Sequence, residues 1–148
     1  MAIGRPKSIV WFEWLFWISF VVSYVGDYVV EGSVLEFIIA DLLTFGIAAL
    51  FWYMITRQSN DVFKWIYTVG AIVGLGIFGL ALTANVIKLD FLDNELLGMS
   101  ASEIVFGIVV NSLNIAAAIC LYLQPSREWF EAQGAVFDWD DKPPGVVK

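Results

Sequence analysis

The sequence predicts an all-α protein: a transmembrane bundle of four helices that cross a membrane up-down-up-down. The first observation behind this prediction is composition, because 59% of the 148 residues are hydrophobic, 16% are charged, and the mean hydropathy is +0.77. Soluble domains average about 45–50% apolar and about 25% charged residues. A domain this size still leaves roughly a third of its unfolded-chain surface in solvent. Much of that solvent must therefore be lipid.

The second observation is a set of four apolar windows. A helix needs about 20 residues to cross a hydrocarbon core of about 30 Å. Helices are expected in these windows because an unpaired backbone polar group is costly in lipid. The predicted spans are residues 9–30, 37–56, 65–87 and 104–123, and they make up a transmembrane domain of residues 1–123.

The first span follows two basic residues, Arg5 and Lys7, as the apolar region of a signal peptide would. The run is long and aromatic, and Gly26 and Asp27 are poor flanks for a cleavage site. We therefore expect a retained membrane anchor at this position.

Lysines and arginines near the span ends set the orientation, since they are enriched on the cytoplasmic side. Of the eight, seven fall on the side of the N-terminus, and only Lys88 falls on the other. Both termini are therefore predicted to be cytoplasmic, with the protein in the inner (plasma) membrane of a bacterium. The opposite side holds eight acids against Lys88, so the formal charge of −7 is expected to face outward. Those acids are Asp27, Glu31, Glu36, Asp41, Asp90, Asp93, Glu95 and Glu103.

Two connections and the tail complete the predicted architecture. Residues 57–64 form a short polar turn, which implies that spans two and three are antiparallel neighbours. Residues 88–103 have leucines at helical spacing, which predicts an interfacial amphipathic helix ended by Gly98. Ser102 is the expected N-cap of the fourth span.

Residues 124–148 are predicted to hold a short interfacial helix and a flexible cytoplasmic tail. Ser126 is the expected N-cap of that helix, which would run through Gln133 and be ended by Gly134. Trp129 and Phe130 would rest at the level of the lipid headgroups.

Small residues mark the expected helix contacts, because close packing and polar contacts, rather than burial of apolar surface, drive helices together in lipid. They lie on the second, third and fourth spans, which are predicted to form the inner seam of the bundle. The residues are Ala40, Thr44, Ala48, Gly70, Gly74, Gly107 and Ala118.

Polar groups inside spans are the candidate functional residues, because each costs about 2.5–3.5 kcal/mol at the bilayer centre on the insertion scale. Glu13 could be an interfacial carboxylate among tryptophans or a carrier of protons or cations. Asp41, Asn85 and Glu103 are expected at one depth in the membrane, below Asp27. Each could be solvated by water at the membrane boundary, or together they could converge on a cation or substrate amine. Asn111 and Asn114 are expected to make hydrogen bonds between helices.

Several chemistries are excluded by the residues the chain lacks. It has no histidine and one cysteine, Cys120, so imidazole catalysis, imidazole metal sites and internal disulfides are excluded. No catalytic, cofactor-binding or metal-ligating residue is predicted, and the apolar composition excludes nucleic acid as a partner. A membrane enzyme would need a divalent-cation site built from the outer carboxylates.

Two functions remain. The favoured one is a non-enzymatic structural, accessory or self-associating subunit, whose partners are the lipid bilayer and either further copies of itself or a larger membrane complex. The alternative is a small proton- or cation-coupled transporter or channel that uses the carboxylates inside its spans. The chain resembles the small multidrug transporters in span count and in the placement of Glu13. It differs in the aromatic residues around that glutamate, in its long outer loop and in its tail.

Overall fold

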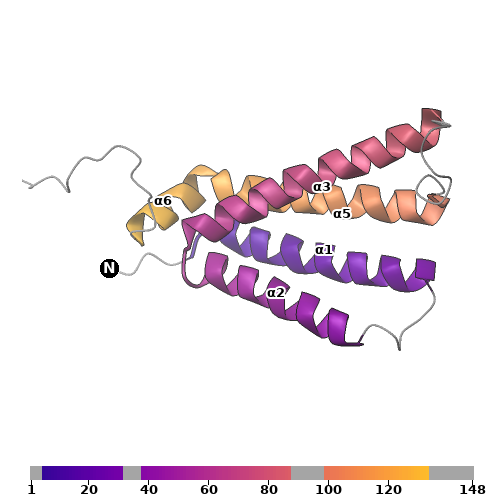
Figure 1. The fold of residues 1–148 in the computed structure, drawn as a ribbon. Coiled ribbons are helices and arrows are strands. Elements are labelled where there is room, and N and C mark those ends of the chain that lie inside the picture. The colour runs from indigo at the N-terminus through magenta and orange to yellow at the C-terminus, as the bar shows by residue number, and fades with distance from the viewer. Residues whose placement is uncertain (1–4, 32–37, 88–98, 134–148) are drawn as a thin grey trace, which may run out of the picture.

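The computed structural model describes residues 5–31, 38–87 and 99–133 (Figure 1). The side chains of residues 29–31, 38–41 and 85–87 lie outside this description, as do the predicted interfacial helix at 88–98 and the tail beyond residue 133. Within the described ranges every regular element is a helix, which confirms the all-α prediction. The helices are α1 (Lys7–Glu31), α2 (Ile38–Thr56), α3 (Asp61–Ile87), α5 (Ala101–Tyr122) and α6 (Gln124–Ala132).

Three of these helices are long and apolar enough to cross a membrane. The stretches are Lys7–Tyr28, Asp61–Ala84 and Ala101–Tyr122. In α2 the described apolar part, Leu42–Thr56, is shorter than a full span. The structure therefore shows three span-capable helices and one shorter apolar helix among the described residues, where the sequence predicted four spans.

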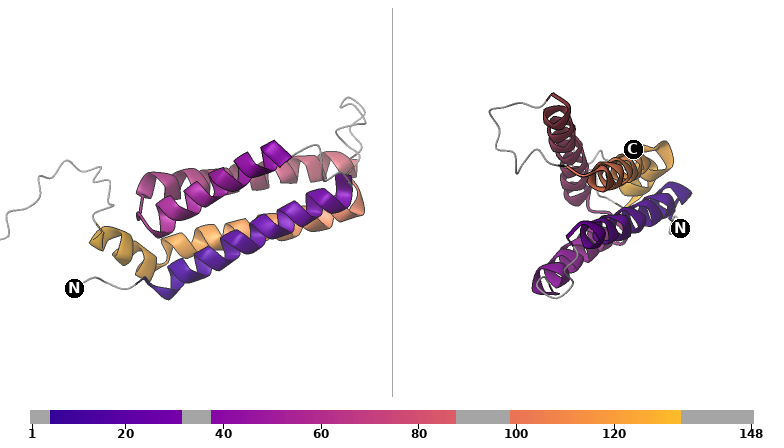
Figure 2. Two further views of the ribbon diagram at one scale, coloured as in Figure 1. Left: turned by 90° about the horizontal axis from the view of Figure 1, so that it is seen from below. Right: turned by 90° about the vertical axis from the view of Figure 1, so that its right-hand side faces the viewer.

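The most extensive packing joins α1 to α5, which lie side by side along their lengths (Figures 1 and 2). Backbones approach closely there: a Cβ placed on Gly26 of α1 would lie 3.0 Å from the Phe106 ring of α5. In turn, α3 packs on α5, and α2 contacts both α3 and α1. The sequence predicted an inner seam formed by the second, third and fourth spans, without the first. The first span was left out because its large aromatic residues do not match the small-residue pattern used to predict helix contacts.

The buried core lies at one end of the bundle, where Arg5, the turn 57–60 and α6 meet; we call this the α6 end. Its members come from four helices, and most are large and apolar. They are Ile9, Phe12, Phe16, Ile55, Ala117, Leu121, Trp129 and Phe130.

The rings of Trp129 and Phe130 are buried against the protein, and their predicted position at the level of the lipid headgroups stays a prediction. The reason for their burial is the start of α6. Leu123 is its N-cap and Pro125 lies in its first turn, so the chain bends directly after α5 and turns one face of α6 back onto the bundle. Ser126 is therefore inside the helix and fully buried, and the prediction that it caps α6 was wrong.

Other helix ends follow from local hydrogen bonds. Asn60 accepts a bond from the Phe63 backbone N–H at 3.2 Å, so α3 begins four residues before the predicted boundary. Ser59 in the preceding turn has a φ of 49°, in the left-handed region. Ser100, rather than the predicted Ser102, caps α5 through a reciprocal capping box with Glu103.

Candidate functional site

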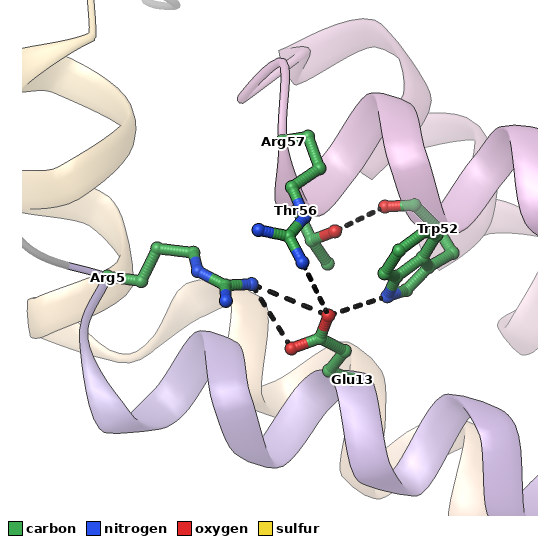
Figure 3. Close-up of polar contacts among 5 residues, drawn as sticks. All are labelled: Arg5, Glu13, Trp52, Thr56 and Arg57. Carbon is green, nitrogen blue, oxygen red and sulfur yellow. Dashed lines mark hydrogen bonds and ion pairs between the residues drawn. The ribbon is translucent and has the colours of Figure 1, made fainter.

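Glu13 lies at the centre of a polar cluster at the α6 end (Figure 3). Its Oε2 lies 3.2 Å from Arg5 Nη1, and its Oε1 lies 4.0 Å from Arg57 Nη2. Trp52 Nε1 donates a hydrogen bond to Glu13 Oε1 at 2.9 Å. The Arg57 guanidinium also lies 5.5 Å above the Trp52 ring, within cation–π distance. One carboxylate therefore joins the segment before α1, α1 itself and the end of α2.

The local charge of this cluster is one negative against two positive groups. The Glu13 side chain is 19% exposed, whereas Arg5 and Arg57 are 33% and 46% exposed. The carboxylate is thus the enclosed partner, and the guanidinium groups reach toward the surface, as long basic side chains do near a membrane boundary. Such an arrangement holds a carboxylate in place by three contacts.

A second polar cluster is built on Asn114 of α5. Ser19 of α1 donates to Asn114 Oδ1 at 2.9 Å, and the Tyr67 hydroxyl of α3 donates to the same oxygen at 3.2 Å. Ser19 Oγ also lies 2.8 Å from the Phe16 carbonyl oxygen, a second acceptor for its single proton. One amide oxygen thus links three helices.

A groove of about 440 Å³ lies beside this cluster, between α2 and α3, and we call it the α2–α3 groove. The two helices diverge from the turn that joins them (Figure 1), and α1 and α5 supply the rest of the lining. Most of its surface is apolar. Its polar lining residues are Ser19, Ser23, Thr44, Tyr67 and Asn114.

A smaller pocket of about 260 Å³ lies toward the other end of the bundle and contains both Asp27 and Glu103. Glu103 accepts a bond from the Ser100 backbone N–H as part of the α5 cap. Asn111 also lines this pocket and donates to the Gly107 carbonyl of its own helix at 2.8 Å. The side chains of Asp41 and Asn85 lie outside the described residues, so their convergence with Glu103 stays a prediction.

The predicted packing residues fall into different surroundings. A Cβ on Gly107 would lie 2.2 Å from the Phe78 ring, whereas one on Gly74 would lie 3.8 Å from Asn111 Oδ1, in ordinary contact. A Cβ on Gly70 would meet nothing within 4 Å. Ala118 is buried, Ala48 packs against the core, and Thr44 lines the α2–α3 groove. The Ala40 side chain lies outside the description.

A third cluster, which was not predicted from the sequence, surrounds Lys64 of α3. This lysine is only 8% exposed and forms an ion pair with Asp61. Its Nζ lies 4.7 Å from the Phe130 ring and 5.2 Å from the Tyr122 ring. The partners of Glu13 and Asn114 were not predicted either. Arg5 is only eight residues from Glu13, but the other partners are distant along the chain and give no local signal.

The comparisons with known proteins give no relative for this chain. No family model, curated protein or solved structure matches it. Among the described residues, no group of three or more His, Cys, Asp or Glu side chains is placed to hold a metal ion.

Proposed function

We propose that this chain is a four-span integral membrane protein of the bacterial inner membrane that acts as a non-enzymatic structural or accessory subunit. The observation that carries the proposal is the use of its polar side chains inside apolar helices. Glu13 is held by Arg5, Trp52 and Arg57, and Asn114 is held by Ser19 and Tyr67. These side chains join helices, which is the usual role of polar groups in membrane helix packing.

The four-span topology is supported by the arrangement of the helix ends. Contacts at the α6 end bring together the start of α1, the turn between α2 and α3, the start of α3 and the end of α5. This end also carries four basic residues, Arg5, Arg57, Lys64 and Arg127. Lysines and arginines near the ends of membrane spans are enriched on the cytoplasmic side.

A role as a subunit is supported by the open surface of α3. None of the residues in its most apolar window is buried within the chain. On this helix, a Cβ added at Gly76 or at Gly79 would meet nothing within 4 Å. Small residues on an apolar helix surface allow a second helix to approach closely. A further copy of the chain or a larger membrane complex would fit this face.

The alternative, a proton- or cation-coupled transporter, has less support. Glu13 is occupied by cationic partners, which leaves, in the part of the chain that the structure describes, the pocket with Asp27 and Glu103 as an acidic candidate. That pocket lies at one end of the bundle, and Glu103 is engaged in the α5 cap.

The test is native mass spectrometry of protein extracted gently into lipid nanodiscs. The proposal expects oligomers, or a complex with other membrane proteins, that weaken in Gly76→Leu and Gly79→Leu. The control is Gly46→Leu, which adds the same side chain at another open glycine on α2. A monomer that shows pH-dependent ion flux in liposomes, lost in Glu13→Gln, would overturn the proposal in favour of the transporter.

A further inference from the structure

The α2–α3 groove has the dimensions and lining of a small-molecule site. Its volume of about 440 Å³ lies within the range of about 300–1,000 Å³ that is usual for ligand pockets. Four helices contribute to it, with aromatic and aliphatic walls that include Phe20, Phe51 and Ile66. In the proposed topology it opens sideways, between α2 and α3, toward the lipid.

Asn114 gives the groove a specific polar feature. Both hydrogen bonds that Asn114 makes with described residues end on Oδ1, from Ser19 and from Tyr67. Its Nδ2 carries two N–H donors that these bonds do not use. A donor that faces apolar surroundings without an acceptor carries a desolvation cost. An acceptor atom in the groove would remove that cost.

The depth of Asn114 restricts what such an acceptor can be. Asn114 lies eight residues before Tyr122, the end of α5, which is about 12 Å along a helix. Phospholipid headgroups and esters stay near the membrane surface, so they do not bring an acceptor to this level. A molecule that does so must carry its polar atom within an otherwise apolar body.

Gly70 provides the space for that body. It lines the groove, and a Cβ at this position would meet nothing within 4 Å. A side chain added here would therefore begin in open space within the groove.

We propose that the α2–α3 groove binds a membrane-soluble carbonyl compound, whose oxygen accepts from Asn114 Nδ2 and whose apolar part lies between α2 and α3 beside Gly70. This goes beyond the proposed structural role, because it assigns the subunit a ligand. The proposal commits to a small molecule and not to a helix of a second copy.

The experiment titrates the full chain in lipid nanodiscs with decylubiquinone, a carbonyl probe that quenches tryptophan fluorescence. Trp17 is a suitable reporter, because its ring lies 5.8 Å from that of Phe20 in the groove wall. We expect saturable quenching. Gly70→Leu should raise the dissociation constant at least about tenfold by filling the site. Asn114→Leu should raise it about threefold or more by removing one hydrogen bond. Gly46→Leu, which is open but outside the groove, should leave it unchanged.

A second arm uses excess decylbenzene, which has the apolar chain and ring but no carbonyl group. Failure of decylbenzene to displace the quinone supports the proposal. Equal quenching in the parent chain and in Gly70→Leu would overturn it. Smaller oligomers in Gly70→Leu, with unchanged quenching, would also overturn it and would place a second copy of the chain in the groove.

Discussion

Ser126 of α6 donates a hydrogen bond to Ser8 Oγ of α1 at 2.6 Å, and both residues are buried. Ser126 Oγ also lies 2.6 Å from the Cys120 carbonyl oxygen at the end of α5. One hydroxyl group therefore connects α6 with α1 and with the end of α5. Because both serines are buried among apolar side chains, few other hydrogen-bond partners are available to their hydroxyl groups.

We predict that Ser126→Ala lowers the stability of the fold by about 1–3 kcal/mol, because Ser8 then loses a buried partner. Thermal unfolding in detergent, followed by tryptophan fluorescence, measures the change. The double variant Ser8→Ala/Ser126→Ala should lose less than the sum of the two single variants. Ser112→Ala, at an exposed position of α5, is the control. Additive losses in the double variant would show that the pair is not coupled.

Lys64→Met is predicted to loosen α6. The substitution keeps a long apolar side chain but removes the cation that lies between Phe130 and Tyr122, and it leaves Asp61 without its ion-pair partner. Cation–π contacts of this kind contribute about 0.5–2 kcal/mol each. Limited proteolysis should cut residues 124–133 faster in the variant. Unchanged cleavage rates would mean that the Lys64 contacts do not hold α6 in place.

At the contact between α3 and α5, Gly107→Ala should destabilise the protein by about 1–3 kcal/mol, because the added Cβ meets the Phe78 ring. The same change at Gly46, where space is open, should be neutral or stabilise by up to about 1 kcal/mol, since alanine favours helices. The melting temperatures of the two variants test this difference. Adding Phe78→Leu to Gly107→Ala should recover much of the loss, and no recovery would contradict the close contact.

Glu13→Gln should reduce stability by less than about 1 kcal/mol, because its ion pairs are partly exposed and weak in water. The amide oxygen of glutamine can still accept from Trp52 Nε1, so the link from α1 to α2 remains. Glu13→Leu removes that acceptor and should cost more. Thermal unfolding of the two variants separates the two contributions, and equal losses would assign the effect to charge rather than to the tryptophan contact.

Hydropathy located the helices well, because a bilayer sets the length of an apolar run. It could not assign neighbours, since nearly uniform apolar surfaces do not indicate which face meets which helix. Thus the pairing of Gly26 with Phe106, in the most closely packed pair of helices, had no sequence signal. Helix caps were misplaced where two serines competed, as at Ser100 and Ser102. The burial of Trp129 depends on the bend after Leu123, a backbone feature that composition does not encode.

For the candidate residues too, the sequence identified the polar side chains but not their partners. Polarity inside an apolar run was enough to select Glu13 and Asn114. Most of their partners come from other parts of the chain: Trp52 of α2 and Arg57 in the turn after it in one case, Ser19 and Tyr67 in the other. Only the packed helices reveal that these side chains are engaged, which changes the interpretation of Glu13 from a free carboxylate to a connecting one.

The docking of α6 on the first turns of α1 also constrains how the protein is made. Ile9 and Phe12 are synthesised early, but their core partners Trp129 and Phe130 are synthesised only after the other described helices. The core at the α6 end is therefore completed last during translation.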